Sequence, residues 1–528
     1  MESKNIVTLD QKISHSDLVA DTEEAIKEDH ELGFFRSVQL YPKAIAWSMA
    51  ICAASIMDGY DLHVVGLLFA VPAFRTAYGD PQPDGSRQIS APWQSGLNNG
   101  SNIGQLAGLF LAGLLSERLG FRKTLMIALV LTPFLILIQF FAPSLVVLEI
   151  GQILLGIPMG LFQTTTIVYA AEVAPTSVRP MLTSWASQMW VLGQILAAVV
   201  GRSVLGVRGS WAYRIPFAVQ WFWPIPVFIA VFFAPESPWW LVRQRRLEDA
   251  KKSLRRLTSD KAGVVNIDKT VALMLVTTEH ERELNASRSY AACFKGTDFR
   301  RTSIVVALYC MQIAAGSTLR AYATYFFEQA GLASDWSFNL SIITYVLSFV
   351  GTVVTASWFL MPHVGRRTLF IWGMATLNVI YFIIGGLAIP AHQSSLSWGI
   401  ASLLVINGFV AYVCIEPIVF ALGSEVPSML LRSKSVAVGR LIYAVFNIAA
   451  NVLTTYQINP SAWNWGAKTG FFWGGFGLLA LVYSYLALPE TKDKTFAELD
   501  YLFEHKVPAR KFAKTQVHPS EIAAWAQR

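Results

Sequence analysis

Long apolar segments, separated by short polar ones, recur along the whole chain. The hydrocarbon core of a bilayer is about 30 Å thick, and a helix needs about 20 predominantly apolar residues to cross it. The pattern therefore predicts an all-α membrane protein with twelve transmembrane helices. The expected spans lie near residues 44–68, 93–115, 124–142, 146–170, 181–203, 213–234, 302–327, 336–360, 368–389, 397–422, 436–457 and 468–488.

The spans fall into two sets of six, and the polar stretch 235–300 separates them. Leucines spaced for one helical face predict short surface helices in this stretch. Carriers built from two repeated halves bind their substrate near the bilayer mid-plane, between the halves. The expected division is an N-terminal tail (1–40), a six-helix bundle (41–234), a linker with short helices (235–300), a second six-helix bundle (301–488) and a C-terminal tail (489–528).

Composition and charge placement fit this division. Of the 528 residues, 54% are hydrophobic and 15% are charged, against about 25% charged residues in soluble proteins. The mean hydropathy is +0.44. The net charge of +7 does not indicate a nucleic-acid partner, because thirteen Lys and Arg lie within 235–300. By the positive-inside rule, that segment and both termini are expected in the cytoplasm.

Three short motifs occur in the same order in both sets of spans. A basic turn follows the second span, an acidic residue and then an arginine follow the fourth, and Pro-Glu-Ser or Pro-Glu-Thr follows the sixth. One such match would mean little, but three in the same order predict a duplicated six-helix unit.

At these motifs the chain resembles the sugar porter family of the major facilitator superfamily, from about residue 40 to about residue 515. Within that family it is most similar to the fungal maltose and α-glucoside permeases, in segments 233–242, 325–331 and 463–466. The resemblance implies a sugar carrier of the plasma membrane that works by alternating access as a single chain. The family's motifs occur here as Gly59-Tyr60-Asp61, Pro235-Glu236-Ser237-Pro238, Gly365-Arg366-Arg367 and Pro489-Glu490-Thr491-Lys492.

The resemblance also implies a gating network of charges at the cytoplasmic ends of the helices. Two departures weaken it. Glu117 and Phe121 replace usual residues of the loop after span 2, and the usual acidic residue before Gly365 is missing, with Pro362 near its place. The residues assigned to the network are Glu117, Arg118, Arg122, Glu172, Arg179, Glu236, Arg366, Arg367, Glu425, Arg432 and Glu490.

Ionisable groups inside a span cost at least ~2.5–3.5 kcal/mol on insertion scales, so each is a functional hypothesis. Asp58 and Asp61 share one helical face of span 1, where two carboxylates cannot both ionise easily and one can exchange a proton. The alternative is a polar part of a helix kinked near Gly59. The fungal permeases that the chain resembles use both positions, with Arg440 as the expected counter-charge, for proton symport. Gln105 stands where many of them have Glu, so uncoupled transport stays open.

Arg320 and Glu416 form the second unusual set of charges. Arg320 falls in span 7, and Glu416 falls in span 10 just before Pro417, where the resembling family has glycine. By the resemblance, both helices line the substrate cavity. A buried charge without a partner is costly, so we predict that these side chains approach each other. The alternative is that one of them reaches toward water near a helix end. Such a pair would favour a polar or acidic ligand over ordinary glucose.

A sugar presents hydroxyl groups and an apolar ring face, so its site needs amide or hydroxyl partners and an aromatic surface. By the resemblance, span 7 supplies hydrogen-bonding positions, with Thr318 where hexose carriers have Asn and Ile313 in place of a second Gln. Each polar side chain could instead bond between helices. The predicted substrate-binding residues are Ser187, Gln188, Gln194, Gln312, Thr318, Tyr322, Phe420 and Asn447.

Other classes of function have less support. The sequence contains no Walker A loop, no zinc-spaced cluster of His and Cys and no nucleophile elbow, so we expect no enzyme activity, cofactor or metal. Because a fold does not fix a function, three alternatives to a proton-coupled sugar carrier stay open. They are an uncoupled sugar facilitator, an exporter of a small metabolite and a transporter-like sugar sensor.

Overall fold

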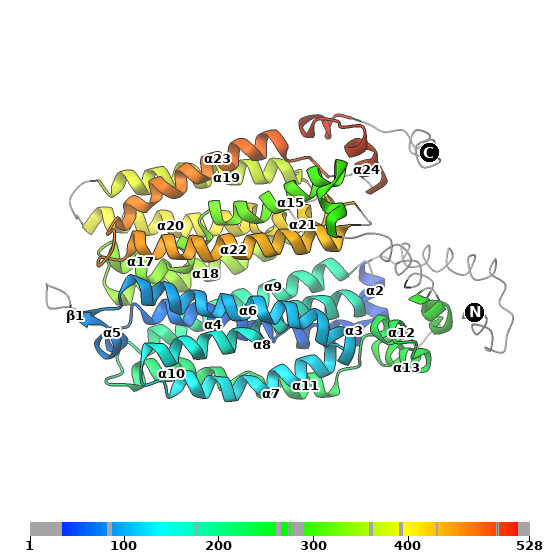
Figure 1. Ribbon diagram of the computed structural model, residues 1–528, viewed down its shortest axis with the longest axis horizontal. Coiled ribbons are helices and arrows are strands. Elements are labelled where there is room, and N and C mark those ends of the chain that lie inside the picture. The colour runs from blue at the N-terminus through cyan, green and yellow to red at the C-terminus, as the bar shows by residue number, and fades with distance from the viewer. Residues whose placement is uncertain are drawn as a thin grey trace.

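A computed structural model of the chain describes residues 34–81, 87–174, 178–259, 266–272, 274–275, 278, 290–357, 363–389, 394–428, 431–492, 494 and 496–515. Within these residues the chain is almost entirely helical, and the long helices form two bundles that lie side by side (Figure 1). Most of the expected N-terminal tail, part of the expected linker, Pro362 and the last residues of the C-terminal tail lie outside the described residues.

The N-terminal bundle contains six membrane crossings. The first is made of two helices, α3 and α4, and the last of α10, η1 and α11. A short antiparallel hairpin pairs Asp80 with Gln88 and Pro81 with Arg87. The elements are α2 (Phe34–Leu40), α3 (Pro42–Cys52), α4 (Ser55–Leu68), α5 (Pro72–Tyr78), β1 (Asp80–Pro81), β2 (Arg87–Gln88), α6 (Ala91–Leu119), α7 (Phe121–Phe140), α8 (Leu145–Val173), α9 (Arg179–Ser203), α10 (Trp211–Val219), η1 (Gln220–Phe222) and α11 (Pro224–Phe233).

Two short helices of the linker, α12 and α13, follow the N-terminal bundle, and six more crossings form the C-terminal bundle. The first of these six is broken into three helices and the fourth into two. The elements are α12 (Pro238–Arg243), α13 (Leu247–Leu257), η2 (Tyr290–Phe294), α15 (Gly296–Ala314), α16 (Ser317–Ala321), α17 (Ala323–Gln329), α18 (Ser334–Ser357), α19 (Arg366–Leu387), α20 (Ser394–Cys414), α21 (Glu416–Glu425), α22 (Arg432–Ile458), η3 (Gly466–Lys468), α23 (Thr469–Ala487), α24 (Phe496–Glu504) and η4 (Ala509–Lys511).

Nine of the described helical segments are long and apolar enough to cross a membrane. The other three crossings are α6, α9 and the broken series α15 to α17, which are more polar. α6 alone carries Asn98, Asn99, Asn102 and Gln105. Polar groups are costly against lipid, so such crossings belong at the contact between the bundles. With them the protein has the predicted twelve transmembrane helices, six in each half.

The bundles meet through α6 against α22 and through α9 against α18. At the end that carries α5 and the β-hairpin, here called the hairpin end, ion pairs join them. Arg75 Nη1 lies 3.3 Å from Glu328 Oε2, and Arg202 Nη1 lies 3.1 Å from Asp335 Oδ1. Asn459 also donates to the carbonyl of residue 89 (3.0 Å). The bundles are therefore tied together at this end.

The opposite end, here called the linker end, carries α12, α13 and α24 (Figure 1). Along the seam between α6 and α22, Asn99 donates to the carbonyl of Ile448 (3.4 Å). Phe110 lies three helical turns beyond Asn99 on α6, toward the linker end, and is 73% exposed. Leu441 lies two turns from Ile448 on α22 in the same direction and is 60% exposed. The ion pairs between the bundles thus lie at the hairpin end, while α6 and α22 carry exposed apolar side chains nearer the linker end.

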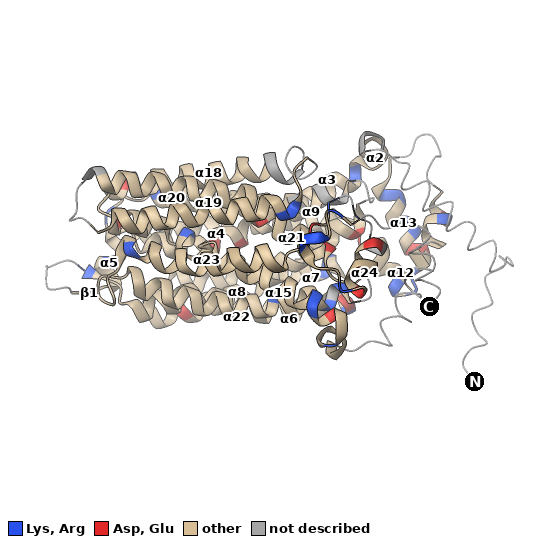
Figure 2. Cartoon of the chain, turned by 90° about the horizontal axis from the view of Figure 1, so that it is seen from above, with Lys and Arg blue, Asp and Glu red and all other residues tan. Residues whose placement is uncertain are grey.

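Charged side chains gather at the linker end, around α12, α13 and α24, whereas the bundles are mostly uncharged along their length (Figure 2). Charges are costly inside a bilayer, so this distribution marks the linker end as an aqueous face. The few charges within the bundles stand apart from it and identify the candidate site.

Candidate functional site

Asp58 and Asp61 lie in the middle of the first crossing, on α4, and both are only 1% exposed. Both carboxylates face α6. Gln105 donates from Nε2 to Asp58 Oδ1 (2.8 Å), and the Ser101 hydroxyl donates to Asp61 Oδ2 (2.9 Å). The structure therefore brings together three of the four residues predicted for proton coupling.

α4 is held in this orientation by close packing on α9. A Cβ on Gly59 would lie 1.9 Å from the carbonyl oxygen of Trp190, and a Cβ on Gly193 would lie 2.3 Å from the carbonyl oxygen of Ile56. Only glycine fits such backbone contacts. Because the side of α4 that carries Gly59 rests on α9, the neighbouring carboxylates turn toward α6.

Arg440, the fourth predicted member, lies elsewhere. Its guanidinium carbon is 5.1 Å from the ring centre of Tyr309 and 4.9 Å from that of Phe420, so it makes cation–π contacts within the C-terminal bundle. Among the ion pairs of the described residues, none joins Arg440 to Asp58 or Asp61. The expected counter-charge of the span 1 carboxylates is therefore not in place in this structure, because α22 presents Arg440 to its own bundle.

Arg320 and Glu416 form an ion pair inside the C-terminal bundle, with Nη2 3.0 Å from Oε1. Gln312 donates from Nε2 to the other carboxylate oxygen, Oε2 (2.7 Å). Arg440 is a second cation within electrostatic reach of Glu416. The Glu416 side chain is 21% exposed and that of Arg320 is 7% exposed, so the carboxylate is partly accessible while the guanidinium is buried.

Arg320 follows a break in the seventh crossing. Gly316, with φ of +77°, separates α15 from α16, and this left-handed conformation is readily adopted by glycine. Close to the break, the carbonyl of Ala315 accepts hydrogen bonds from Arg320 Nη1 (2.6 Å) and from the Tyr381 hydroxyl (3.0 Å). The broken helix therefore anchors the guanidinium on one side while Glu416 holds it on the other.

Glu416 also stands at a break, as the first residue of α21. Pro417 lacks a backbone N–H and cannot continue the hydrogen-bond ladder from α20, so a new helix begins there. The amide end of a helix carries partial positive charge, which favours a carboxylate at this position. Local sequence thus places the anion of the pair, and the packing of α21 against α15 brings it to Gln312.

Two predicted sugar contacts of span 7 are occupied by bonds between helices. The Tyr322 hydroxyl accepts from Asn98 Nδ2 (2.8 Å) and also bonds with the Thr455 hydroxyl (2.8 Å). The Thr318 hydroxyl accepts from that of Thr454 (2.9 Å). In this conformation both side chains are buried, so they can meet a ligand only when these bonds open.

Gln194 of α9 is 1% exposed, and its Nε2 lies 2.9 Å from Nε2 of His63 on α4. His63 Nδ1 lies 3.0 Å from the carbonyl of Gly59. Donation from Nδ1–H to that carbonyl leaves Nε2 free to accept from the Gln194 amide, which fixes both side chains. Sequence analysis did not single out His63, although it is an ionisable group inside a span.

The remaining predicted contacts are spread around the same region. Gln188 is 7% exposed, Ser187 and Asn447 are half-buried, and Phe420 is 41% exposed. Phe420 presents its ring to Arg440, and its edge-on neighbour is Tyr309 at 6.3 Å between ring centres. An exposed aromatic ring next to charged groups provides the kind of surface on which a sugar ring can stack.

A second ionisable residue that sequence analysis missed is Glu149, in the second turn of α8. It lies against α6, where a Cβ on Gly100 would be 2.9 Å from Glu149 Oε1. The rule that marks charges inside spans would have identified it too. Within the described part of the chain, no three His, Cys, Asp or Glu side chains are grouped so that they could hold a metal ion.

Charged motif residues of the N-terminal bundle meet at the linker end. Glu236 accepts from the backbone amides of Phe121 (3.1 Å) and Arg122 (3.2 Å), so it caps the start of α7. Burial raises the pKa of the Glu236 carboxyl, and these amide donors oppose the shift. Glu172 pairs with Arg243 (2.6 Å), a partner that the motif did not indicate.

The other motif residues of this bundle contribute less. The carbonyl of Glu117 accepts from Trp240 Nε1 (3.0 Å) and Gln244 Nε2 (2.9 Å), which attaches the linker helix α12 to the end of α6. Arg118 is exposed. The side chain of Arg179 lies outside the described residues.

The C-terminal bundle repeats the arrangement. Glu490 accepts from the backbone amide of Arg367 (3.2 Å) at the start of α19, just as Glu236 does at the start of α7. Arg366 pairs with Glu425 (3.4 Å), and Arg432 lies within electrostatic reach of Glu425. The duplicated motifs thus perform the same capping task in both halves.

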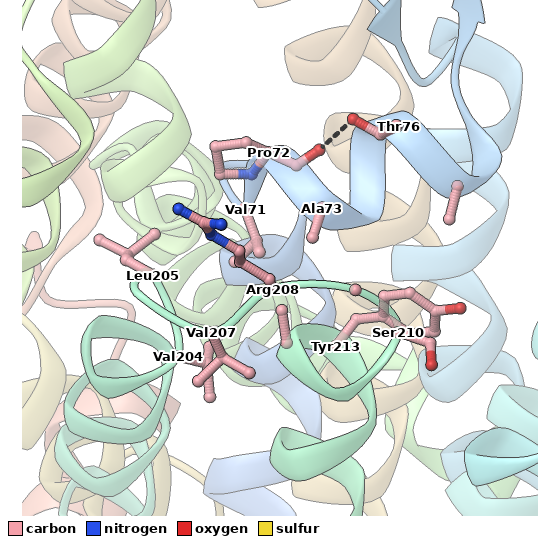
Figure 3. A pocket seen from close by; sticks show the side chains of 13 residues that line it. Val71, Pro72, Ala73, Thr76, Val204, Leu205, Val207, Arg208, Ser210 and Tyr213 are labelled. Carbon is pink, nitrogen blue, oxygen red and sulfur yellow. Dashed lines mark hydrogen bonds between the residues drawn. The ribbon is translucent and has the colours of Figure 1, made fainter.

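A separate groove of about 440 Å³ lies at the hairpin end of the N-terminal bundle (Figure 3). None of the predicted site residues lines it, so we do not assign it to the candidate site. Its lining comes from α5 and from the segment between α9 and α10, and consists of Val71, Pro72, Ala73, Thr76, Ala77, Val204, Leu205, Val207, Arg208, Gly209, Ser210, Ala212 and Tyr213.

Comparison with known sequences gives a consistent result. Residues 47–503 match the protein family described as sugar (and other) transporters. A general α-glucoside permease of Saccharomyces cerevisiae is 39% identical over 512 residues, which cover 96% of this chain and 83% of the relative. A maltose permease of the same yeast is 38% identical over 509 residues, which cover 95% of this chain and 82% of the relative.

Solved structures show the same fold. The proton:xylose symporter XylE bound to 6-bromo-6-deoxy-D-glucose superimposes with a TM-score of 0.66 at 23% identity, covering 88% of this chain and 99% of that one. The inward-open conformation of the xylose transporter XylE from E. coli superimposes with a TM-score of 0.67 at 22% identity, covering 87% and 99%. The first of these is described as a member of the major facilitator superfamily.

Proposed function

Because this chain belongs to the family of sugar (and other) transporters, we propose that it carries an α-glucoside or another di- or oligosaccharide across the plasma membrane. It is a transporter and not an enzyme. The observation that supports the proposal most directly is the set of buried polar side chains Gln312, Gln194 and Tyr322, of which Tyr322 bonds to both bundles. Amide and hydroxyl groups are what a sugar requires, and they would be costly against lipid.

The mechanism that we propose is alternating access, in which the two halves rock about a site between them. Among the described residues, the two ion pairs that join the bundles, Arg75–Glu328 and Arg202–Asp335, both lie at the hairpin end. With the linker in the cytoplasm, this is a conformation that faces inward. Transport requires that sugar binding stabilises an intermediate that is closed at both ends. One end can then close before the other opens.

We further propose that transport is coupled to protons through α4. Asp58 and Asp61 are buried carboxylates whose partners, Gln105 and Ser101, are neutral. A carboxyl in this setting can take up a proton while the site is open to one side of the membrane and release it while the site is open to the other. The membrane potential then contributes ~2.3 kcal/mol per charge per 100 mV to uptake. A single chain is the working unit in this proposal, with both tails and the linker in the cytoplasm.

The division of the chain is part of the same proposal: tail 1–40, bundle 41–234, linker 235–300, bundle 301–488 and tail 489–528. In this proposal four residue groups carry the function. These are the proton-coupling group, the substrate-binding group, the pair Arg320–Glu416 and the motif residues at the linker end of each bundle.

Uptake of labelled maltose, cellobiose and glucose by transporter-deficient yeast cells tests the proposal, with and without a protonophore. We expect saturable uptake of maltose, abolished by the protonophore and absent in Asp61→Asn. Uptake that ignores the protonophore identifies an uncoupled facilitator. Uptake of none of the three sugars, with efflux of a loaded metabolite, identifies an exporter. Signalling without flux identifies a sensor, and either of the last two results contradicts sugar uptake.

A further inference from the structure

A cluster of buried polar groups lies inside the N-terminal bundle, away from the space between the halves. At its centre is Asp61. Its Oδ2 accepts from Ser101, but its Oδ1 has no hydrogen-bond partner among the described protein atoms. Two glutamine side chains also interact with this carboxylate: Gln139, at the end of α7, and Gln220, in η1. They are 2% and 4% exposed.

Neither glutamine makes a hydrogen bond of ordinary geometry to the carboxylate. Both amide atoms of Gln139 and Nε2 of Gln220 have no hydrogen-bond partner in the described protein. Gln152 on the neighbouring α8 is 1% exposed, and both of its amide atoms are likewise without a partner. Buried polar atoms that lack a partner are costly, and polar groups slightly too far apart for a direct bond are commonly joined by water.

Small residues make room for the cluster. A Cβ at Gly151 would lie 2.9 Å from Gln139 Cγ, and a Cβ at Gly100 would lie 3.3 Å from Gln152 Cβ. Gly100 is followed by Ser101, the direct donor to Asp61. The glycines therefore let two amide side chains lie at the contact of α6, α7 and α8, on the side of α4 that carries the carboxylate.

We propose that Gln139, Gln152 and Gln220 form, together with buried water, the counter-group of the ionised Asp61 carboxylate. This rests on the proposed function, in which Asp61 releases a proton during transport. An ionised carboxylate away from bulk water needs an opposite charge or hydrogen-bond donors. Arg440 is held against Tyr309 and Phe420 in the other bundle, so neutral donors take its place here.

Amide and water groups suit a carboxyl that must change its state. An amide carries both an N–H donor and a carbonyl acceptor, and water carries both as well. The same cage can therefore donate to the ionised carboxylate and accept from the protonated acid. A fixed arginine would stabilise only the ionised form. The glutamines act through water and orientation, so they are positioning residues for the proton site.

Other titratable groups surround α4. Asp58, Tyr60 and His63 lie on the same helix, and Glu149 lies on α8 beside Gly100. Among the described residues, none of these groups forms an ion pair with Asp61. The same is true of the charged and titratable groups on the helices that pack on α4. The helices that pack on α4 also carry Glu117 and Arg118 on α6, Tyr169 and Glu172 on α8, Arg202 on α9, Tyr213 and Arg214 on α10, and Tyr325 and Glu328 on α17.

The first test is proton-driven sugar uptake by the full-length protein in liposomes, against sugar exchange without a proton gradient. The Gln139→Leu substitution removes a hydrogen-bond donor that, in this proposal, stabilises the ionised Asp61 carboxylate. We expect the pH at which driven uptake declines on the alkaline side to rise by about one to two pH units. A shift of this magnitude corresponds to the free energy of one hydrogen bond to a charged group. Driven uptake should fall at least fivefold, while exchange is kept. Gln220→Leu should act in the same direction.

Gln457→Leu is the matched control. Gln457 is 0% exposed, both of its amide atoms lack a partner, and it lies on α22 in the other bundle. The same substitution there removes an equally buried amide far from Asp61. A pH profile that moves equally in Gln139→Leu and Gln457→Leu contradicts the cage, because the effect would then be one of packing.

A second measurement does not require transport. Infrared difference spectra of the purified protein report the carboxyl stretch as pH is varied, and Asp61→Asn assigns the band. The midpoint in Gln139→Leu should lie above that of the wild type and of Gln457→Leu. An unchanged midpoint overturns the proposal. A midpoint that depends on sodium also overturns it, because a metal cation would then fill the cage. A shifted midpoint without proton-driven uptake supports the cage and refutes the proposed coupling.

Discussion

Arg320 Nη2 and Glu416 Oε1 lie 3.0 Å apart, although 96 residues separate them in the chain. Each stands at a break in its helix. Arg320 Nη1 donates to the carbonyl of Ala315 beside the first break, and Glu416 is the first residue of α21 at the second. Broken helices at the mid-plane are where carriers of this architecture bind solutes. We therefore propose that the pair contacts the substrate as well as its own partner.

Charge exchange tests this pair. Arg320→Glu alone and Glu416→Arg alone each leave like charges in contact, so either change should lower uptake about ten- to a hundredfold. The double exchange restores opposite charges and should recover a substantial part of the activity. Uptake of labelled maltose at equal surface expression is the measurement. A double variant no better than either single one contradicts the functional pairing.

Opening of the hairpin end should depend on Arg75 and Glu328. This pair joins the two bundles and its side chains are only 17% and 9% exposed, so Arg75→Ala should favour the outward-facing state by about 2 kcal/mol. Labelling of a cysteine introduced between the bundles at this end would report the shift as faster modification. Arg246→Ala is the control, because its pair with Asp249 is exposed on the linker and should have no effect.

Close packing of α4 on α9 should tolerate no side chain at position 59. A Cβ there meets a backbone oxygen at 1.9 Å, so Gly59→Ala must separate the helices and should destabilise the protein by about 3 kcal/mol or more. Thermal unfolding in detergent is the measurement. Gly113→Ala provides the matched control, since nothing lies within 4 Å of a Cβ at that position, and its melting temperature should stay the same or rise.

Stability at the linker end should depend on pH through Glu236. Burial raises the pKa of this carboxyl above its ordinary value of 4.5, so the folded protein binds the proton more tightly than the unfolded chain does. The stabilisation is fully present below the ordinary pKa and is lost as pH rises through the raised pKa. The melting temperature of the wild type relative to Glu236→Gln should therefore fall as the pH rises above 4.5. A difference that rises over this range contradicts the assignment.

The sequence by itself determined the membrane class, the twelve crossings and their two sets of six, because the thickness of a bilayer imposes a length of apolar residues that can be read directly. It also indicated the charges that matter. Asp58, Arg320 and Glu416 stand out from apolar surroundings whatever their neighbours are. Gly316 and Pro417 mark helix breaks for reasons of backbone chemistry that are equally local.

The sequence predicted that Arg320 and Glu416 meet, but for most polar groups only the tertiary structure decided which of them meet. Arg440 was expected beside the carboxylates of α4 and lies instead against two aromatic rings, while Gln139 and Gln220, from separate elements, lie near Asp61. Hydropathy gives the length of a helix but not its rotation about its axis or its neighbours. Those depend on small residues at helix crossings, such as Gly59 and Gly151, whose effect appears only when the second helix is present.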